Sequence, residues 1–194
     1  MLTREIVIMN LSKNKLKAIP DEIISSWPWI IELNLSENYI EKLHDDIQNL
    51  VELQILDLSN NGITYVTQLK NNLKLKKLFL KRNRLKTIEY LNQNRELEVL
   101  DYSENEVTTL NEWEYNLPTS IVEFNLSGNQ IKSILAPRTL FCLSKLERLN
   151  FSENPFTKTL SSNKIDIVHF ILSLLIDWSL KFVNDKKLTH TDFK

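Results

Sequence analysis

The side chains that most often perform catalysis or bind metal ions are few in this 194-residue chain, and they are scattered along it. Its three histidines, His44, His169 and His190, share no metal-binding spacing with one another or with the single cysteine, Cys142. We expect each histidine to be structural or solvated. Cys142 follows Phe141 in an apolar stretch, so it is expected to be a small buried hydrophobic residue, with a nucleophilic thiol as the alternative.

Phosphate binding and carboxylate catalysis are also poorly supported. The chain has two glycines, Gly62 and Gly128, which cannot form a glycine-rich phosphate-binding loop. Asp57 and Asp101 are a candidate carboxylate pair, but Phe79 lies between them in the repeat described below. Two strand spacings would separate them by about 10 Å, which makes a glycosidase-type site a poor match. We therefore expect no enzyme activity, no metal ion and no cofactor.

Composition indicates one domain in a reducing compartment. A hydrophobic content of 42% can build a continuous core, and a net charge of −1 argues against a global attraction to nucleic acid or anionic membranes. A single cysteine favours a cytoplasmic protein, with the nucleus or a host cytosol as alternatives. The first residues lack the pattern of a cleaved secretion signal. The most apolar segment, 165–183, contains too many polar residues to span a membrane.

The dominant pattern is a repeat marked by an asparagine every 22 to 25 residues. These asparagines are Asn14, Asn38, Asn61, Asn83, Asn105, Asn129 and Asn154. The positions eight, five and three before each asparagine, and two after it, are always apolar. Because strand side chains alternate between faces, the residues five and three before are expected to point into a core, and those six, four and two before to point outward. The asparagine amides are expected to bond the backbones of adjacent coils. The return segments should be irregular, 3₁₀-helical or short α-helical.

The pattern LxxLxLxxNxL over about residues 6–156 resembles the signature of the leucine-rich-repeat family, with repeats of the short intracellular type. The resemblance implies an α/β fold, a right-handed horseshoe solenoid in which a parallel sheet lines the concave face. In this family, a protein partner commonly docks on that face.

The two ends of the chain are expected to differ. We expect the solenoid, about seven repeats, to occupy residues 1–160, and a C-terminal capping helix and tail to occupy 161–194. Ser161–Asn163 could cap a helix from about Lys164 to Phe182, one stripe of which would seal the last repeat. Its second stripe would pack against the tail or contact a partner. The strand at 6–9 is apolar on both faces and would be an open edge, so self-association there or through the helix is an alternative.

The outward positions carry the candidate binding site. The residues four before each asparagine are Asn or Asp, and those two before are Ser, except in the fourth repeat, which has Phe79 and Lys81. Aromatic and cationic side chains are frequent in binding hot spots. The predicted partner-binding residues are Asp57, Lys77, Phe79, Lys81, Val99, Asp101 and Glu123. Residues 74–86 of the fourth repeat are rich in lysine and arginine, and we call them the lysine-rich repeat; Asp57, Asp101, Glu32 and Glu123 flank them. A partner with an acidic centre and basic edges would complement this arrangement. The alternative is that these charges are only a solvated surface.

These features predict a non-catalytic scaffold that binds a protein of unknown identity on its concave face. One alternative is a regulatory or substrate-recruiting subunit of an enzyme such as a phosphatase or ligase. Another is a bacterial effector-type repeat protein that acts on host proteins. Nucleic-acid binding through the lysine-rich repeat is the weakest alternative because the total charge is near neutral. No small-molecule substrate is expected.

Overall fold

Seven short parallel strands stack side by side, one from each repeat. The computed structural model describes residues 7–88, 90–110, 113–133, 143–163, 166 and 180–189. The strands are β1 (Ile8–Asn10), β2 (Glu32–Asn34), β3 (Ile55–Asp57), β4 (Lys77–Phe79), β5 (Val99–Asp101), β6 (Glu123–Asn125) and β7 (Arg148–Asn150). Each spans the positions six to four before its asparagine, and neighbours pair without any shift in register. The predicted parallel sheet and its register are therefore confirmed.

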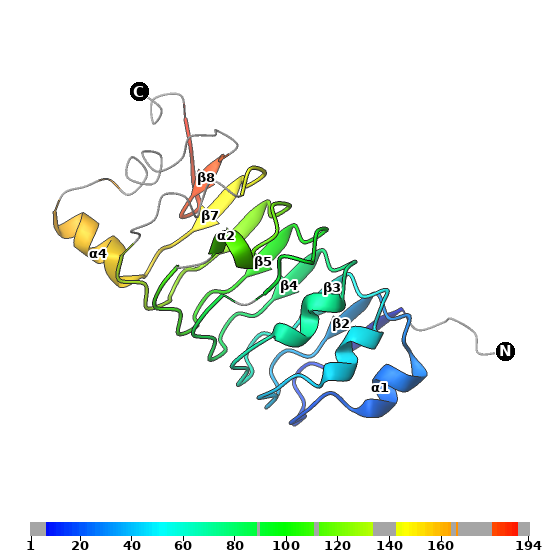
Figure 1. Ribbon diagram of the computed structural model, residues 1–194. Coiled ribbons are helices and arrows are strands. Elements are labelled where there is room, and N and C mark those ends of the chain that lie inside the picture. Colours follow the sequence, from blue (N-terminus) through cyan, green and yellow to red (C-terminus); the bar gives the residue numbers. More distant parts are fainter. Residues whose placement is uncertain are drawn as a thin grey trace.

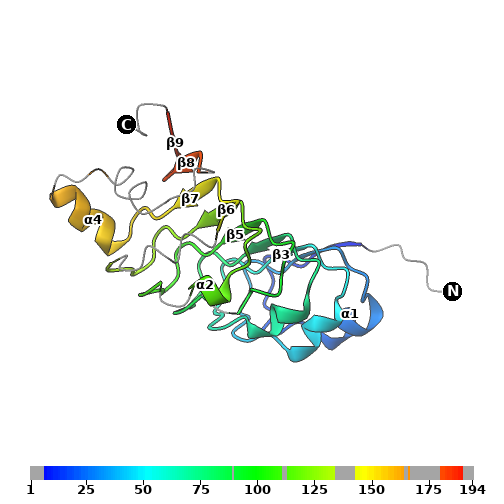
Figure 2. The ribbon, with the colours of Figure 1, turned by 45° about the horizontal axis from the view of Figure 1, so that its top comes forward.

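The return segments form the second layer of the molecule (Figures 1 and 2). They contain short helices and 3₁₀ helices: α1 (Asp21–Ser26), η1 (Asp45–Asn49), η2 (Thr67–Asn71), α2 (Trp113–Asn116) and, after the last asparagine, α4 (Pro155–Ser162). In Figure 2 the strands form one wall of the stack, and α1 and α2 lie on the opposite side. This arrangement leaves the outward side chains of the strands uncovered by the helices.

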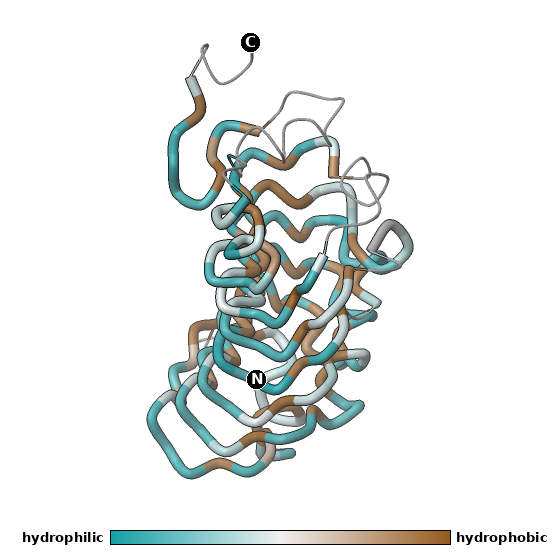
Figure 3. The backbone as a smooth tube through the Cα atoms, turned by 90° about the vertical axis from the view of Figure 1, so that its left-hand side faces the viewer, coloured by the Kyte–Doolittle hydropathy of each residue, from teal (hydrophilic) through white to brown (hydrophobic). Residues whose placement is uncertain are grey.

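The core is built from the same position of every coil, as Figure 3 shows by the apolar segments that recur along the stack. The residues five before each asparagine from the second repeat on are almost fully buried: Leu33, Leu56, Leu78, Leu100, Phe124 and Leu149. In the first repeat Met9, Leu11 and Leu16 are only partly buried, and β1 pairs with β2 alone within the described residues. The predicted inward and outward alternation is confirmed.

The repeat asparagines connect each coil to the one before it. The Asn105 Nδ2 atom donates to the carbonyl oxygens of Leu80, Tyr102 and Ser103 at 2.9, 3.1 and 3.1 Å. Its Oδ1 accepts the backbone N–H of Leu85 at 3.1 Å. The same pattern recurs from Asn38 to Asn154, whereas the exposed Asn14 donates only within its own coil. The predicted amide bonds between adjacent coils are therefore present. We call the column of seven repeat asparagines the ladder.

A left-handed backbone conformation precedes every ladder asparagine. The φ angles are positive at Lys13, Glu37, Asn60, Arg82, Glu104, Gly128 and Glu153. For a side chain other than glycine, this conformation costs about 1 kcal/mol. Each of the first six also donates its backbone N–H to a carbonyl of the next coil, as Glu104 does to Ser127 at 2.7 Å. The inter-coil bonds therefore hold a conformation that most of these residues would avoid.

A second column of asparagines lies in the return layer, which we did not predict. Asn72, Asn94 and Asn116 are each eleven residues after a ladder asparagine, and all three are buried. Asn94 Nδ2 donates to the carbonyls of Leu69 and Asn72, both at 2.9 Å. Asn72 and Asn116 likewise donate to carbonyls of the preceding coil. Because loops leave backbone carbonyls without regular partners, these amides stabilise the return layer.

The C-terminal end differs from the prediction. The described helix in this region is α4, which begins at Pro155 directly after the last ladder asparagine, contains Ser161 and Ser162, and ends before its C-cap Asn163. Proline favours the first turn because its missing N–H would have no partner there. Most of the expected helix 164–182 lies outside the described residues, but its expected last residue is wrong, because Phe182 lies in a strand.

That strand, β8 (Phe182–Val183), adds to β7 in parallel, and β9 (Lys186–Lys187) returns antiparallel to it. The turn residues Asn184 and Asp185 have φ angles of 47° and 62°, as a tight hairpin turn requires. Asn184 Oδ1 accepts the backbone N–H of Phe151 at 2.7 Å. Val183 and Leu188 are buried, so this hairpin covers the end of the last repeat.

Replacing Asn105 by alanine should lower the free energy of unfolding by about 3 kcal/mol, because three carbonyls and one N–H of a buried turn lose their partner. Chemical denaturation with circular dichroism measures this change. Asn14→Ala is the matched control, with an expected loss below about 1 kcal/mol because its bonds are exposed and local. Equal losses in the two variants would contradict an inter-coil role for the ladder.

The return-layer column can be tested in the same way. Asn94→Ala should lower the free energy of unfolding by about 2 kcal/mol, because two buried carbonyls lose their donor. The exposed Asn92 lies in the same coil, so Asn92→Ala should change stability by less than about 0.5 kcal/mol. If Asn94→Ala unfolds at the same denaturant concentration as the parent chain, this column does not stabilise the return layer.

Candidate protein-binding face

The concave face consists of the outward side chains of β1–β7 and the residues just after them. Most of its Asn and Asp residues close the end of their own strand. Asp101 Oδ1 accepts the backbone N–H of Ser103 at 2.9 Å and its hydroxyl at 2.6 Å. We call this arrangement an Asx turn. The residues that accept the N–H of a serine in this way are Asn10, Asn34, Asp57, Asp101, Asn125 and Asn150. Asn and Asp are interchangeable in this turn.

The fourth repeat lacks this turn. Phe79 takes the place of the Asn or Asp and Lys81 that of the serine, so neither residue can form the bond that closes the other strands. Phe79 pairs in register with Asp57 of β3 on one side and with Asp101 of β5 on the other. Its ring is half-buried. An aromatic side chain therefore lies between two carboxylates at the middle of the concave face.

Two shallow hollows meet at Phe79. The first has a volume of about 270 Å³, and Ile8, Glu32, Ile55 and Asp57 line it together with Phe79. The second, of about 200 Å³, extends from Phe79 along Val99, Asp101 and Glu123 to Arg148 and Phe182. The concave face is thus a continuous trough, with the Phe79 ring at its centre.

The far wall of the second hollow is formed by residues that we did not predict. Arg148 lies with its Cζ atom 3.9 Å from the centre of the Phe182 ring, and its Nε is 3.1 Å from Glu123 Oε1. Asp185 Oδ2 accepts from Asn150 Nδ2 at 3.1 Å. Phe182 and Asp185 belong to the hairpin, which has no repeat pattern. The Asn184–Asp185 pair was the available signal, because such pairs favour hairpin turns.

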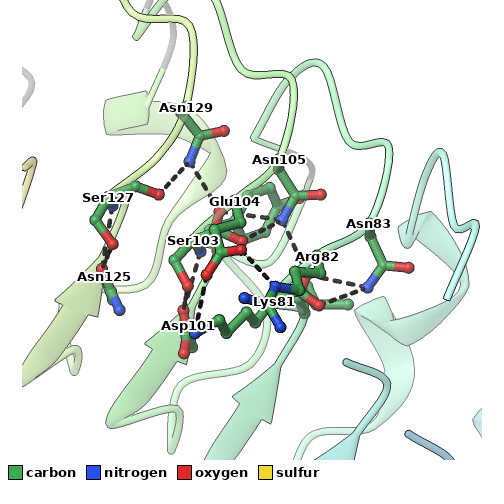
Figure 4. A network of polar contacts seen from close by, with 12 residues as sticks. Lys81, Arg82, Asn83, Asp101, Ser103, Glu104, Asn105, Asn125, Ser127 and Asn129 are labelled. Atoms are coloured by element: carbon green, nitrogen blue, oxygen red, sulfur yellow. Dashed lines mark hydrogen bonds and ion pairs between the residues drawn. The ribbon is translucent and has the colours of Figure 1, made fainter. Parts of the chain in front are cut away.

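The lysine-rich repeat is partly neutralised by its neighbours (Figure 4). Glu104 binds both Arg82 and Lys81, with Lys81 Nζ 3.0 Å from its Oε1. The hydrogen bonds from Arg82 and then Lys81 hold the pKa of Glu104 below its usual range, so this carboxylate keeps its charge to lower pH than an unpaired glutamate. Lys74 similarly pairs with Glu52 at 2.7 Å.

The seven predicted residues therefore separate into two groups. Phe79, Val99, Asp101 and Glu123 line one hollow, and Asp57 joins Phe79 in the other. Lys77 is exposed on β4 and Lys81 lies at the rim beside Glu104, and neither lines a hollow. The apolar and acidic side chains, more than the lysines, form the wall of the trough.

No arrangement for metal binding occurs among the residues that the structure describes. His44 is exposed at the start of η1, where its Nδ1 lies 3.3 Å from the backbone N and 3.1 Å from the Oδ2 of Asp46. Cys142, His169 and His190 lie outside the described residues, so their expected roles stay predictions. None of the helices within the described ranges has the length and apolar character that crossing a membrane requires.

Comparisons with known proteins agree with the repeat. A family model described as "Leucine rich repeat" matches residues 4–63. A MAP kinase phosphatase with leucine-rich repeats from Dictyostelium discoideum is 31% identical over an 87-residue alignment, and the match covers 37% of this chain and 10% of that protein. The chain thus spans a small part of this relative.

Solved structures share the fold. An internalin of Listeria monocytogenes superposes with a TM-score of 0.69 at 18% identity, covering 91% of this chain and 47% of its own. A leucine-rich-repeat protein of Leptospira interrogans superposes with a TM-score of 0.66 at 27% identity, and the match covers 89% of this chain and 41% of that chain. TLR13, solved as a complex with ssRNA13, superposes with a TM-score of 0.69 at 30% identity, and the match covers 78% of this chain and 22% of that chain. With its seven-coil asparagine ladder and parallel sheet, this chain has the leucine-rich-repeat fold, and its residues 4–63 match that family's model.

Proposed function

We propose that the chain is a non-catalytic binding module that holds a protein partner in the trough of its concave face. The observation that carries this proposal is Phe79: a half-buried aromatic ring that replaces a strand-closing Asn or Asp at the point where two hollows meet. The fourth repeat has an apolar ring in place of a stabilising turn, and the exposed part of that ring does not add to the stability of the fold. Aromatic anchors in the centre of a face are typical of binding hot spots.

The rigidity of the trough supports the same function. The outward side chains stand on strands that are paired on both sides from β2 to β7, and the Asx turns fix the end of most of them. A partner therefore loses little binding free energy to ordering of the sheet. The hollows are shallow and below the roughly 300 Å³ of small-molecule sites, which favours a protein surface over a small ligand.

A second candidate is recruitment of substrates for an attached or associated enzyme. It is favoured by the similarity to the repeat-containing MAP kinase phosphatase, in which the matched segment is 10% of the protein. Under this proposal, the trough would select the substrate and the catalytic groups would belong to another domain or chain. Co-purification of a phosphatase activity with the full-length native protein would support this candidate.

Nucleic-acid binding is less well supported. TLR13 was solved with ssRNA13, but here the trough is lined by Glu32, Asp57, Asp101 and Glu123, whose carboxylates repel phosphates. An effector acting on host proteins would use the same face, and the bacterial neighbours agree in fold with that alternative. We place the protein in the cytoplasm on the strength of its single cysteine.

Replacing Phe79 by alanine should weaken binding of the protein partner about 30-fold, because a central aromatic anchor contributes on the order of 2 kcal/mol. The partner is first recovered from native extract on the immobilised chain, and its affinity for each variant is then measured by calorimetry. Circular dichroism confirms that the variant is folded.

Tyr115→Ala is the matched control, since Tyr115 is an aromatic residue of α2 in the return layer and is 67% exposed. It should leave the affinity unchanged within about twofold. Full affinity of the Phe79→Ala variant would rule out the centre of the trough as the binding site.

A further inference from the structure

We infer that Asp57, Phe79 and Asp101 together bind a cationic side chain, arginine in preference to lysine, from a basic segment of the protein partner. This inference rests on the proposed function and specifies the chemistry of the partner. It reverses the charge that the lysine-rich sequence of the fourth repeat suggested, namely an acidic centre in the partner.

The first argument is the register of the three residues. Asp57, Phe79 and Asp101 are direct neighbours across β3, β4 and β5, so the backbone of each aspartate lies one strand spacing, about 4.8 Å, from that of the aromatic residue. The Oδ1 atoms of both aspartates accept backbone N–H groups, at 2.9 Å in each case. These bonds fix the carboxylates and leave both Oδ2 atoms without a hydrogen bond among the described residues. A guanidinium stacked on the ring would lie between the two carboxylates and be attracted by both.

The second argument is an intact example of this arrangement in the same trough. Arg148 stacks on Phe182 at 3.9 Å and pairs with Glu123 at 3.1 Å, so an aromatic ring and a carboxylate of this face already hold a guanidinium. Phe79 has the same kind of neighbours, but no cation lies over its ring among the residues that the structure describes. We expect an arginine of the partner to lie over Phe79 in the way that Arg148 lies over Phe182.

The third argument concerns the two lysines that flank Phe79 in the sequence. Lys77 and Lys81 lie two residues before and after Phe79, which places them about 7 Å from it along the strand, farther than the two aspartates. Lys81 is bound to Glu104 at 3.0 Å, and this pair reduces its repulsion of an incoming cation. Only Lys77 opposes the cation without an ion pair in the described structure.

The lining of the trough is mostly negatively charged. Its outward positions and the hairpin contribute five carboxylates: Glu32, Asp57, Asp101, Glu123 and Asp185. Among the described residues, Arg148 is the cation that lines these hollows, and Glu123 holds it. Lys77 and Lys81 flank Phe79 outside the hollows, with Lys81 held by Glu104, and the hairpin adds Lys186 and Lys187 on β9. A basic segment lying across the strands would therefore be attracted along its length, with its central arginine on Phe79.

The test uses the labelled chain and the peptide acetyl-Gly-Ser-Arg-Ser-Gly-amide, with versions that carry citrulline or glutamate in place of arginine. Citrulline keeps the planar shape of the arginine side chain and lacks its charge. NMR titration of the Phe79 ring resonances should show saturable shifts with the arginine peptide, about tenfold weaker binding of the citrulline peptide and no binding of the glutamate peptide.

Variants of the chain then assign the effect to these residues. Asp57→Asn with Asp101→Asn should weaken the arginine peptide about tenfold, and Lys77→Gln should tighten it about twofold. The double variant keeps the Asx turns, because asparagine accepts the same serine N–H in four other repeats. Asp21→Asn with Glu22→Gln on α1 makes the same change in net charge and should have little effect.

Equal binding of the arginine and citrulline peptides, or tighter binding of the glutamate peptide with a loss on Lys77→Gln, would overturn the inference. Failure of the proposed function has a different signature. If Phe79→Ala abolishes binding of the recovered partner while the double asparagine variant keeps full affinity, the trough is the binding site but the partner does not use a cation there. If Phe79→Ala has no effect on that partner, the proposed function itself is wrong.

Discussion

The structure depends on the side-chain amide of one asparagine in each coil. A solenoid must turn its backbone at the same place in every coil, and this turn leaves carbonyl and N–H groups facing inward, where water cannot reach them. The amide can donate two hydrogen bonds and accept others, so it bonds its own turn and the preceding coil together. No aliphatic side chain could do so, and aspartate would lack the donors.

The ladder also explains why the concave face can vary. Because the inward residues and the amides hold each coil, the outward positions need only satisfy the end of the strand, which either Asn or Asp does. The charge of the face is therefore nearly independent of its fold. In this molecule, that freedom produced two carboxylates beside an aromatic ring in the three central repeats.

Much of the fold could be predicted because each residue of the repeat has one physical task. The spacing of the asparagines and leucines was sufficient to assign the strands, their register and the buried positions, since alternation along a strand decides which side chains meet. The position of Phe79 between Asp57 and Asp101 followed from the same register.

Other features had no repeating signal. The hairpin formed by β8 and β9 is made of two-residue strands, too short for alternation to be visible, so Phe182 was assigned to a helix instead. The pairs that connect Glu104 to Lys81 and Arg148 to Glu123 join side chains of different coils, and rotamers rather than spacing decide them. The column of Asn72 and Asn94 was detectable in principle, because it keeps a constant distance from the ladder.

The antiparallel hairpin at the C-terminal end has a consequence for how chains of this kind can associate. Every coil of the solenoid adds its strand in parallel, whereas β9 runs in the opposite direction and presents an edge that carries Lys186 and Lys187. A second molecule could not continue the stack of coils through this edge in register, and the lysines disfavour strand pairing with another copy. We therefore expect the hairpin to disfavour end-to-end stacking of copies through this edge of the described sheet.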